Sequence, residues 1–260
     1  MLALFFRWFE RNQVYHPFPK QWAITGDALG RPWQPIRFPT SDGLSLSGWY
    51  FPADKTAARS QLVVLVHHGN AGNVSHRLSL YRLLLDLGLN VLAYDYRGYG
   101  QSEGSPSEAG TYADGEAALA WLQTQGFPAE RVIAHGESLG GGIAAEMALR
   151  HPDLKGVILR STFTSIPDLG RELFPFLPVR WLATIHYDTR SKLPRIRVPV
   201  LLLHSRTDTL IRYAHAESNL AAANEPKWLR EIDGDHNDQP DASPEIYARA
   251  VAEFLDVTRR

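Results

Sequence analysis

Apolar residues occur along this chain in short continuous runs, and most runs are followed by a longer segment with helical spacing of apolar positions. Runs such as QLVVLVH at 61–67 and VPVLLLH at 198–204 are typical of strands buried on both faces. The pattern predicts strands at 34–38, 44–51, 61–67, 90–94, 131–135, 155–160, 198–204 and 227–232, and helices at 75–87, 107–125, 141–150, 213–223 and 244–257. Because strands that alternate with such helices pair in parallel, we expect an α/β fold with a mostly parallel, doubly wound sheet.

The first two expected strands form an exception to the parallel pattern. They are joined by Thr40-Ser41-Asp42-Gly43, and Asp-Gly between two extended runs is a strong hairpin signal. We therefore expect an antiparallel pair at one edge of the sheet.

Residues 1–34 stand apart from the α/β domain expected at 35–260. Leu2, Phe5, Phe6 and Phe9 recur at helical spacing and form one apolar face, and the segment then becomes irregular and rich in proline and tryptophan. One interpretation is a helix that lies on a membrane through residues 1–12. The alternatives are a helix docked on its own domain or on a second subunit, or the remnant of a longer anchor.

The segment at about 161–195 also interrupts the alternation. It places aromatic residues and several prolines between two predicted core strands, including Phe163, Phe174, Phe176 and Trp181. It is longer than most connections in α/β units, and it follows the carboxyl end of a strand. We expect a small cap insertion here; the alternative is a connecting helix that packs on the sheet.

Composition excludes several classes of protein. The chain has 260 residues, enough for one large domain, and a net charge of −1, which gives no electrostatic basis for binding nucleic acid. It has no cysteine, so disulfides, thiolate catalysis and Cys-ligated zinc are excluded. No stretch approaches the roughly 20 apolar residues of a membrane-spanning helix. The absence of cysteine leaves the compartment undecided, so the localisation is unknown. A cytoplasmic or peripheral membrane location is favoured, and the oligomeric state is open.

Candidate chemistry begins at Gly136-Glu137-Ser138-Leu139-Gly140, which lies between the strand RVIAH and a helix. Strand, G-x-S-x-G and helix in this order form the nucleophile-elbow motif. A strand that turns directly into a helix strains the central residue and leaves no room for side chains two positions away on either side. We expect Ser138 to be an exposed nucleophile at the helix N-terminus, where unpaired N–H groups favour negative charge.

A serine nucleophile requires a base and a carboxylate. His236, in the Gly-Asp-His-Asn-Asp loop after the last strand, is the preferred base, and His204, at the end of the preceding strand, is the alternative. Asp208, just after the strand VPVLLLH, is the preferred carboxylate. Asp233, Asp235 and Asp238 rank lower, because neighbours in a tight loop rarely reach the histidine Nδ1.

Acyl transfer also requires donors for the negative oxygen of the transition state. Leu139 follows the nucleophile and is expected to supply one backbone N–H. The second is expected from Asn70, with Ala71 as the alternative, in the loop after QLVVLVH. This chemistry requires no metal and no organic cofactor.

These residues together resemble the α/β-hydrolase superfamily. The resemblance rests on HHGNAGN at 67–73, DYRGYGQSEGSPSE at 95–108, GESLGG at 136–141, SRTDTLI at 205–211 and GDHND at 234–238, and it covers the chain from about residue 35 to the end. More narrowly, the chain resembles abhydrolase-domain serine hydrolases, which include membrane-associated depalmitoylating enzymes and lysophospholipid hydrolases. The resemblance implies the α/β-hydrolase fold, a serine esterase or thioesterase with Ser138, Asp208 and His236 as its triad, and an N-terminal hydrophobic segment that often anchors members to membranes.

Three functions remain open at this stage. The first is hydrolysis of an ester or thioester of an apolar acyl group, so that the expected partner is a small acyl ester or a lipid-like substrate. The second is a serine peptidase that acts on short peptides. The third is a non-catalytic binding module on the same fold.

Overall fold

A computed structural model describes residues 2–17, 22–238 and 240–258, and only the backbone of residues 2–4. Within this part of the chain an eight-stranded sheet has the order β1-β2-β4-β3-β5-β6-β7-β8. Its strands are β1 (Gln34–Pro39), β2 (Ser45–Phe51), β3 (Val63–His67), β4 (Asn90–Tyr94), β5 (Val132–Glu137), β6 (Gly156–Arg160), β7 (Val200–His204) and β8 (Lys227–Glu231). The sheet confirms the predicted α/β class.

Pairing within the sheet follows the predicted directions. β2 is antiparallel to both β1 and β4, whereas every pair from β4 through β8 is parallel. The antiparallel edge expected from Asp42-Gly43 is therefore confirmed. The turn is tied by the Thr40 hydroxyl, which donates to Asp42 Oδ1 over 2.6 Å.

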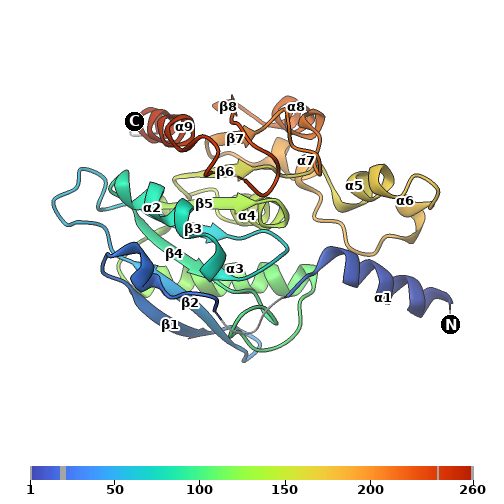
Figure 1. The fold of residues 1–260 in the computed structure, drawn as a ribbon, viewed down its shortest axis with the longest axis horizontal. Helices are drawn as coiled ribbons and strands as arrows, with labels where there is room; N and C mark the ends of the chain where they lie inside the picture. The colour runs from blue at the N-terminus through green and yellow to red at the C-terminus, as the bar shows by residue number, and fades with distance from the viewer. Residues whose placement is uncertain (1, 18–21, 239, 259–260) are drawn as a thin grey trace.

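Helices cover both faces of the sheet (Figure 1). The α-helices are α1 (Leu2–Val14), α2 (Leu78–Asp86), α3 (Glu108–Thr124), α4 (Leu139–Arg150), α5 (Ile166–Leu173), α6 (Val179–Leu182), α7 (Thr189–Lys192), α8 (Tyr213–Ala222) and α9 (Pro244–Val257). Short 3-10 turns lie at η1 (Gly26–Leu29), η2 (Val74–His76), η3 (Ala129–Arg131) and η4 (Leu193–Arg195).

Two hydrophobic clusters fill the space between the sheet and its helices. Side chains alternate along each central strand: Val63 and Leu65 of β3 enter the cluster shared with α3 and α4, whereas Val64 and Val66 enter the cluster shared with α2 and α9. A strand that is buried on both faces must be apolar at every position, which explains the continuous runs in the sequence.

The segment at 161–195 contains α5, α6, α7 and η4 and connects β6 to β7. It is tied to α3 by Glu108, whose carboxylate accepts from the backbone N–H groups of His186 and Tyr187 over 2.7 and 2.8 Å. The Tyr187 side chain is fully buried, and its hydroxyl lies 2.7 Å from Thr111 Oγ1 and 3.0 Å from Tyr15 Oη. The same tyrosine therefore links this segment to α3 and to the residue that follows α1.

α1 packs against the 161–195 segment at one end of the molecule (Figure 1). The Glu10 carboxylate accepts from Thr184 N, Thr184 Oγ1 and Ile185 N, all within 3.0 Å. The predicted apolar face divides between two environments, because Phe6 and Phe9 line a pocket whereas Phe5 is 54% exposed. The side chain of Leu2, also assigned to this face, lies outside the described residues. No described helix is long and apolar enough to span a bilayer.

Buried titratable groups make stability depend on pH. Burial lowers the pKa of His67, His68 and His135 to about 3, so these histidines are neutral in the folded protein. Burial also raises the pKa of Asp95 and Asp114 to about 6. Between about pH 6.5 and pH 4 the unfolded chain binds protons at the histidines, whereas the folded chain binds them at the aspartates. The histidines outnumber the aspartates, so stability falls as the pH falls through this window.

Replacing one of these histidines tests the origin of the acid sensitivity. His135→Gln removes one proton that only the unfolded chain takes up. Below about pH 6 the slope of its unfolding free energy against pH should therefore be smaller than that of the wild type, by about 1.4 kcal/mol per pH unit. Urea unfolding at a series of pH values measures this slope, with the exposed His186→Gln as the control. Equal slopes for His135→Gln and the wild type would contradict the prediction.

Candidate active site

Ser138 lies at the junction of β5 and α4 and has a left-handed backbone, with φ at 51°. The flanking glycines are required by close approach. A Cβ on Gly136 would lie 2.3 Å from the carbonyl oxygen of Gly140, and one on Gly140 would lie 2.0 Å from that of His67. The junction is held by Ser138 N, which donates to Arg160 O over 2.9 Å. The helix begins at Leu139, two residues before its predicted start, because the chain turns directly from strand to helix.

The prediction that Ser138 is exposed is wrong. The residue is only 6% exposed, because the 161–195 segment and α1 build walls over the end of the sheet. Ser138 instead lines a pocket together with Asn70 and Leu139. A reacting group would therefore meet the hydroxyl in a cavity and not on an open surface.

The structure brings the three residues selected from the sequence into one hydrogen-bonded line. His236 Nδ1 lies 2.8 Å from Asp208 Oδ2, and His236 Nε2 lies 3.2 Å from Ser138 Oγ. All three residues are buried. They come from the ends of three different strands, since Ser138 follows β5, Asp208 follows β7 and His236 follows β8.

The charge of Asp208 determines the direction of these bonds. Burial alone would raise the pKa of this carboxyl, but the hydrogen bond and charge of His236 and the N–H of Ile211 outweigh it and hold the pKa below its usual value. An ionised carboxylate only accepts, so His236 Nδ1–H donates to it. The other ring nitrogen of a neutral imidazole is then an acceptor, and Ser138 Oγ–H donates to Nε2.

Two residues ranked as alternatives, His204 and Asp235, make other contacts. His204 Nε2 is 2.7 Å from the carbonyl oxygen of Ile211 and 3.6 Å from Asp208 Oδ2, so this histidine supports the Asp208 loop. Asp235 accepts from Thr209 N over 2.8 Å and from the backbone N–H of His236 over 2.7 Å, which orients the loop and not the imidazole.

The two candidate oxyanion donors lie beside Ser138. Leu139 is the first residue of α4, so its N–H has no acceptor within the helix. Asn70 is anchored by its own carbonyl, which accepts from the Tyr99 hydroxyl over 3.0 Å and from His16 N over 3.1 Å. The segment that follows α1 thus fixes the loop after β3, a contact for which the sequence gives no signal.

The pocket above Ser138 has a volume of about 320 Å³ and an apolar lining. Its wall comes from α1 and from the 161–195 segment, and the lining side chains include Phe9, Val14, Phe163, Leu169, Leu173, Phe174, Leu177 and Leu182. Glu10 also lines the pocket, but its carboxylate oxygens are occupied by Thr184 and Ile185. The arrangement suits an apolar group next to the Ser138 hydroxyl.

A largely buried cluster of charges begins at Glu137, the residue before Ser138. Glu137 Oε2 is 2.8 Å from Arg160 Nη2, and Glu137 Oε1 is 3.2 Å from Arg77 Nη2. Burial would raise the pKa of Glu137, but the two guanidinium groups outweigh it and hold the pKa well below its usual range. Arg77 also reaches the carbonyl oxygen of Asn73 over 3.5 Å, so the cluster joins the elbow to the loop after β3. Sequence reasoning missed this cluster, although Arg160 at the end of an apolar strand was a signal.

Comparisons with known proteins agree with this architecture. The family model described as the alpha/beta hydrolase fold matches residues 63–182. An uncharacterized protein of Mycobacterium tuberculosis is 39% identical, over 84% of this chain and 78% of that protein. An alpha/beta hydrolase domain-containing protein of Arabidopsis thaliana is 31% identical, over 95% of this chain and 88% of that protein.

A solved structure also has the same fold. An esterase of Pyrococcus furiosus superposes with a TM-score of 0.76 at 23% identity, over 94% of this chain and 98% of that one. At this identity the likeness concerns the fold alone. With the relative in Arabidopsis and the family model, the resemblance stated from the motifs is confirmed: this chain belongs to the α/β-hydrolase family.

Proposed function

We propose that this chain is a serine hydrolase that cleaves a carboxylic ester, or a thioester, of an apolar acyl group. The observation that carries the proposal is the hydrogen-bonded line from Ser138 through His236 to Asp208. Its Ser138 end lines an apolar pocket. Hydroxyl, imidazole and carboxylate at 3.2 and 2.8 Å are arranged to transfer a proton from the attacking oxygen.

The proposed reaction has two halves. Ser138 Oγ attacks the acyl carbonyl carbon and passes its proton to His236 Nε2, and the N–H groups of Leu139 and Asn70 stabilise the negative oxygen that forms. The tetrahedral intermediate collapses, and the leaving alcohol or thiol takes the proton from His236. Water then attacks the acyl-enzyme, with His236 as its base, and releases the carboxylic acid and free Ser138.

The pocket indicates which part of the substrate it binds. Its walls are aliphatic and aromatic, and the 161–195 segment, which we propose acts as a cap, supplies most of them. An acyl chain or an aromatic acyl group would be desolvated there, next to Ser138. The peptidase alternative would need a free carboxylate to hold a substrate amine, and the Glu10 carboxylate is already occupied by Thr184 and Ile185.

Loss of the nucleophile should abolish turnover. Ser138→Ala is expected to lower kcat for p-nitrophenyl butyrate at least about 1,000-fold, because the attacking oxygen is removed. Initial rates measure the effect, and thermal unfolding shows whether the variant is folded. Ser105→Ala, at an exposed serine, is the matched control. A folded Ser138→Ala protein with the wild-type rate would rule out this nucleophile.

Esters with longer acyl chains should be hydrolysed more efficiently, because the chain fills the apolar pocket. We expect kcat/KM to rise roughly fourfold for each added methylene from p-nitrophenyl acetate upward, until the pocket is filled. Phe9→Ala removes an apolar pocket wall and should reduce the gain for long esters while leaving acetate hydrolysis near the wild-type rate. A flat profile of kcat/KM with chain length in the wild type would show that the acyl group binds elsewhere.

The choice of carboxylate can be tested with a pair of variants. Asp208→Asn should lower kcat by roughly 10⁴-fold, because the amide favours the wrong imidazole tautomer. Asp235→Asn should have a far smaller effect, because its carboxylate contacts Thr209 and a backbone N–H. Parallel kinetics on one ester compare them; a larger loss in Asp235→Asn would assign the acid to that residue.

A further inference from the structure

Several of the most exposed apolar side chains gather around the pocket. Phe176, between α5 and α6, is 97% exposed, and Trp181, on α6, is 91% exposed. On α1, Trp8 is 62% exposed and Phe5 is 54% exposed. Aromatic side chains that lie this far into solvent are unusual unless they bind something.

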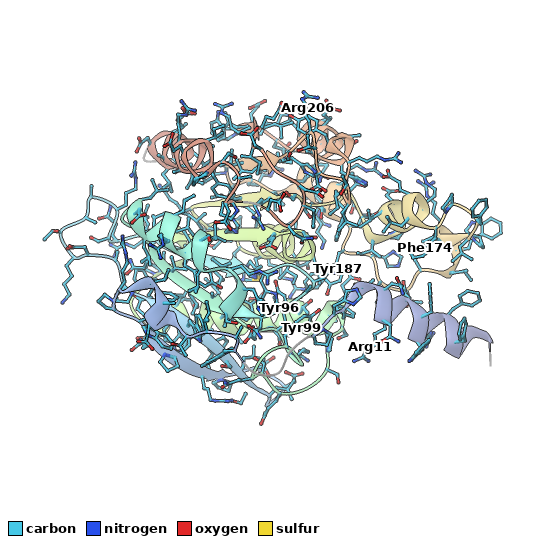
Figure 2. The ribbon with its side chains drawn as sticks, viewed as in Figure 1. Arg11, Tyr96, Tyr99, Phe174, Tyr187 and Arg206 are labelled. Carbon is cyan, nitrogen blue, oxygen red and sulfur yellow. The ribbon has the colours of Figure 1, made fainter. Side chains whose placement is uncertain are left out.

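The two stretches that carry these side chains meet at the pocket, because both α1 and residues 173–182 supply lining residues. The Phe9 and Phe174 rings, which line the pocket, have centroids 5.8 Å apart and join α1 to the residues after α5. Phe5 packs on Phe9 with centroids 6.4 Å apart. Figure 1 shows α1, α5 and α6 at one end of the molecule, and Figure 2 shows Phe174 and Arg11 at that end. We call the exposed aromatic residues Phe5, Trp8, Phe176 and Trp181 the rim surface.

The charges next to the rim surface are mostly positive. Arg7, Arg11, Arg171 and Arg180 are all exposed. Within the described part of the chain only Arg180 of these four contacts a carboxylate, that of Asp168 at 3.2 Å. The three acidic residues in the same stretches are engaged. Glu10 accepts hydrogen bonds from the 184–185 backbone, Asp168 pairs with Arg180 and Arg190, and Glu172 faces His215. Exposed tryptophan, phenylalanine and arginine together are typical of a surface that lies in the headgroup region of an anionic bilayer.

We propose that the rim surface docks on an anionic phospholipid bilayer and that the pocket takes its acyl substrate from that bilayer. This rests on the proposed function and narrows its substrate to an acyl lipid. The chain would lie on the bilayer, since α1 has 13 residues and is about 20 Å long, shorter than the roughly 30 Å hydrocarbon core. Docked in this way, an acyl chain passes into the pocket without crossing water.

The test uses the full chain and measures binding apart from turnover. Vesicles of phosphatidylcholine with phosphatidylglycerol, and of phosphatidylcholine alone, are sedimented with wild type, with Phe176→Ser/Trp181→Ser, and with Val257→Ser. Val257 is 51% exposed on α9, and Figure 1 shows that helix far from α1 and α6, so Val257→Ser is the control. Neither Phe176 nor Trp181 lines the pocket, so hydrolysis of p-nitrophenyl butyrate reports whether the double variant is intact.

The wild type and Val257→Ser should sediment with the anionic vesicles, more than with phosphatidylcholine alone. The double variant should bind at least about tenfold more weakly, because two large apolar side chains no longer enter the interface. Equal binding by the double variant, or no binding by the wild type, would overturn the proposal. A wild-type dimer that the double variant loses, without vesicle binding, would assign the surface to a second copy instead.

The same experiment separates this proposal from the proposed function. Ser138→Ala should bind the vesicles as the wild type does, because docking does not use the nucleophile. Vesicle binding without any ester hydrolysis would contradict the proposed hydrolase activity and its lipid substrate. The assignment of the docking surface would still hold. Ester hydrolysis without vesicle binding would contradict only the docking surface.

Discussion

The left-handed backbone at Ser138 is the constraint on which the arrangement of the site depends. A non-glycine residue in this conformation costs about 1–3 kcal/mol, and it persists only where its surroundings enforce it. Here β5 is held between β3 and β6, and the Thr162 hydroxyl donates to Ser138 O over 2.7 Å. Gly140 lies so close to β3 that a Cβ there would be 2.0 Å from His67 O. The strain places Oγ at the base of the pocket, within reach of His236.

Parallel pairing then assembles the rest of the site. The carboxyl ends of parallel strands meet at one edge of a sheet, so loops that are distant in sequence become neighbours. Asn70 follows β3, Ser138 follows β5, Asp208 follows β7 and His236 follows β8. No single local motif contains the site, and its precision comes from the buried sheet and from the charge cluster around Glu137.

The sequence was sufficient where local chemistry determines structure. Continuous apolar runs predicted the strands, and the G-x-S-x-G motif with Asp208 and His236 selected residues that the structure brings together. It was insufficient where contacts are made at long range. The burial of Ser138 depends on walls from α1 and 161–195, and an amphipathic face predicts that a helix packs without indicating against what. The contacts of Glu10 with the 184–185 backbone, and of Arg160 with Glu137, likewise join residues that no periodicity connects.

The most direct measurement is mass spectrometry of the whole protein after incubation with a fluorophosphonate, followed by peptide mapping. An activated serine with a nearby base displaces fluoride and keeps the phosphonyl group. One adduct for each chain, mapped to Ser138 and lost in His236→Ala, is the predicted result. No adduct, or an adduct on another residue of the wild type, would contradict the assignment of Ser138 as an activated nucleophile.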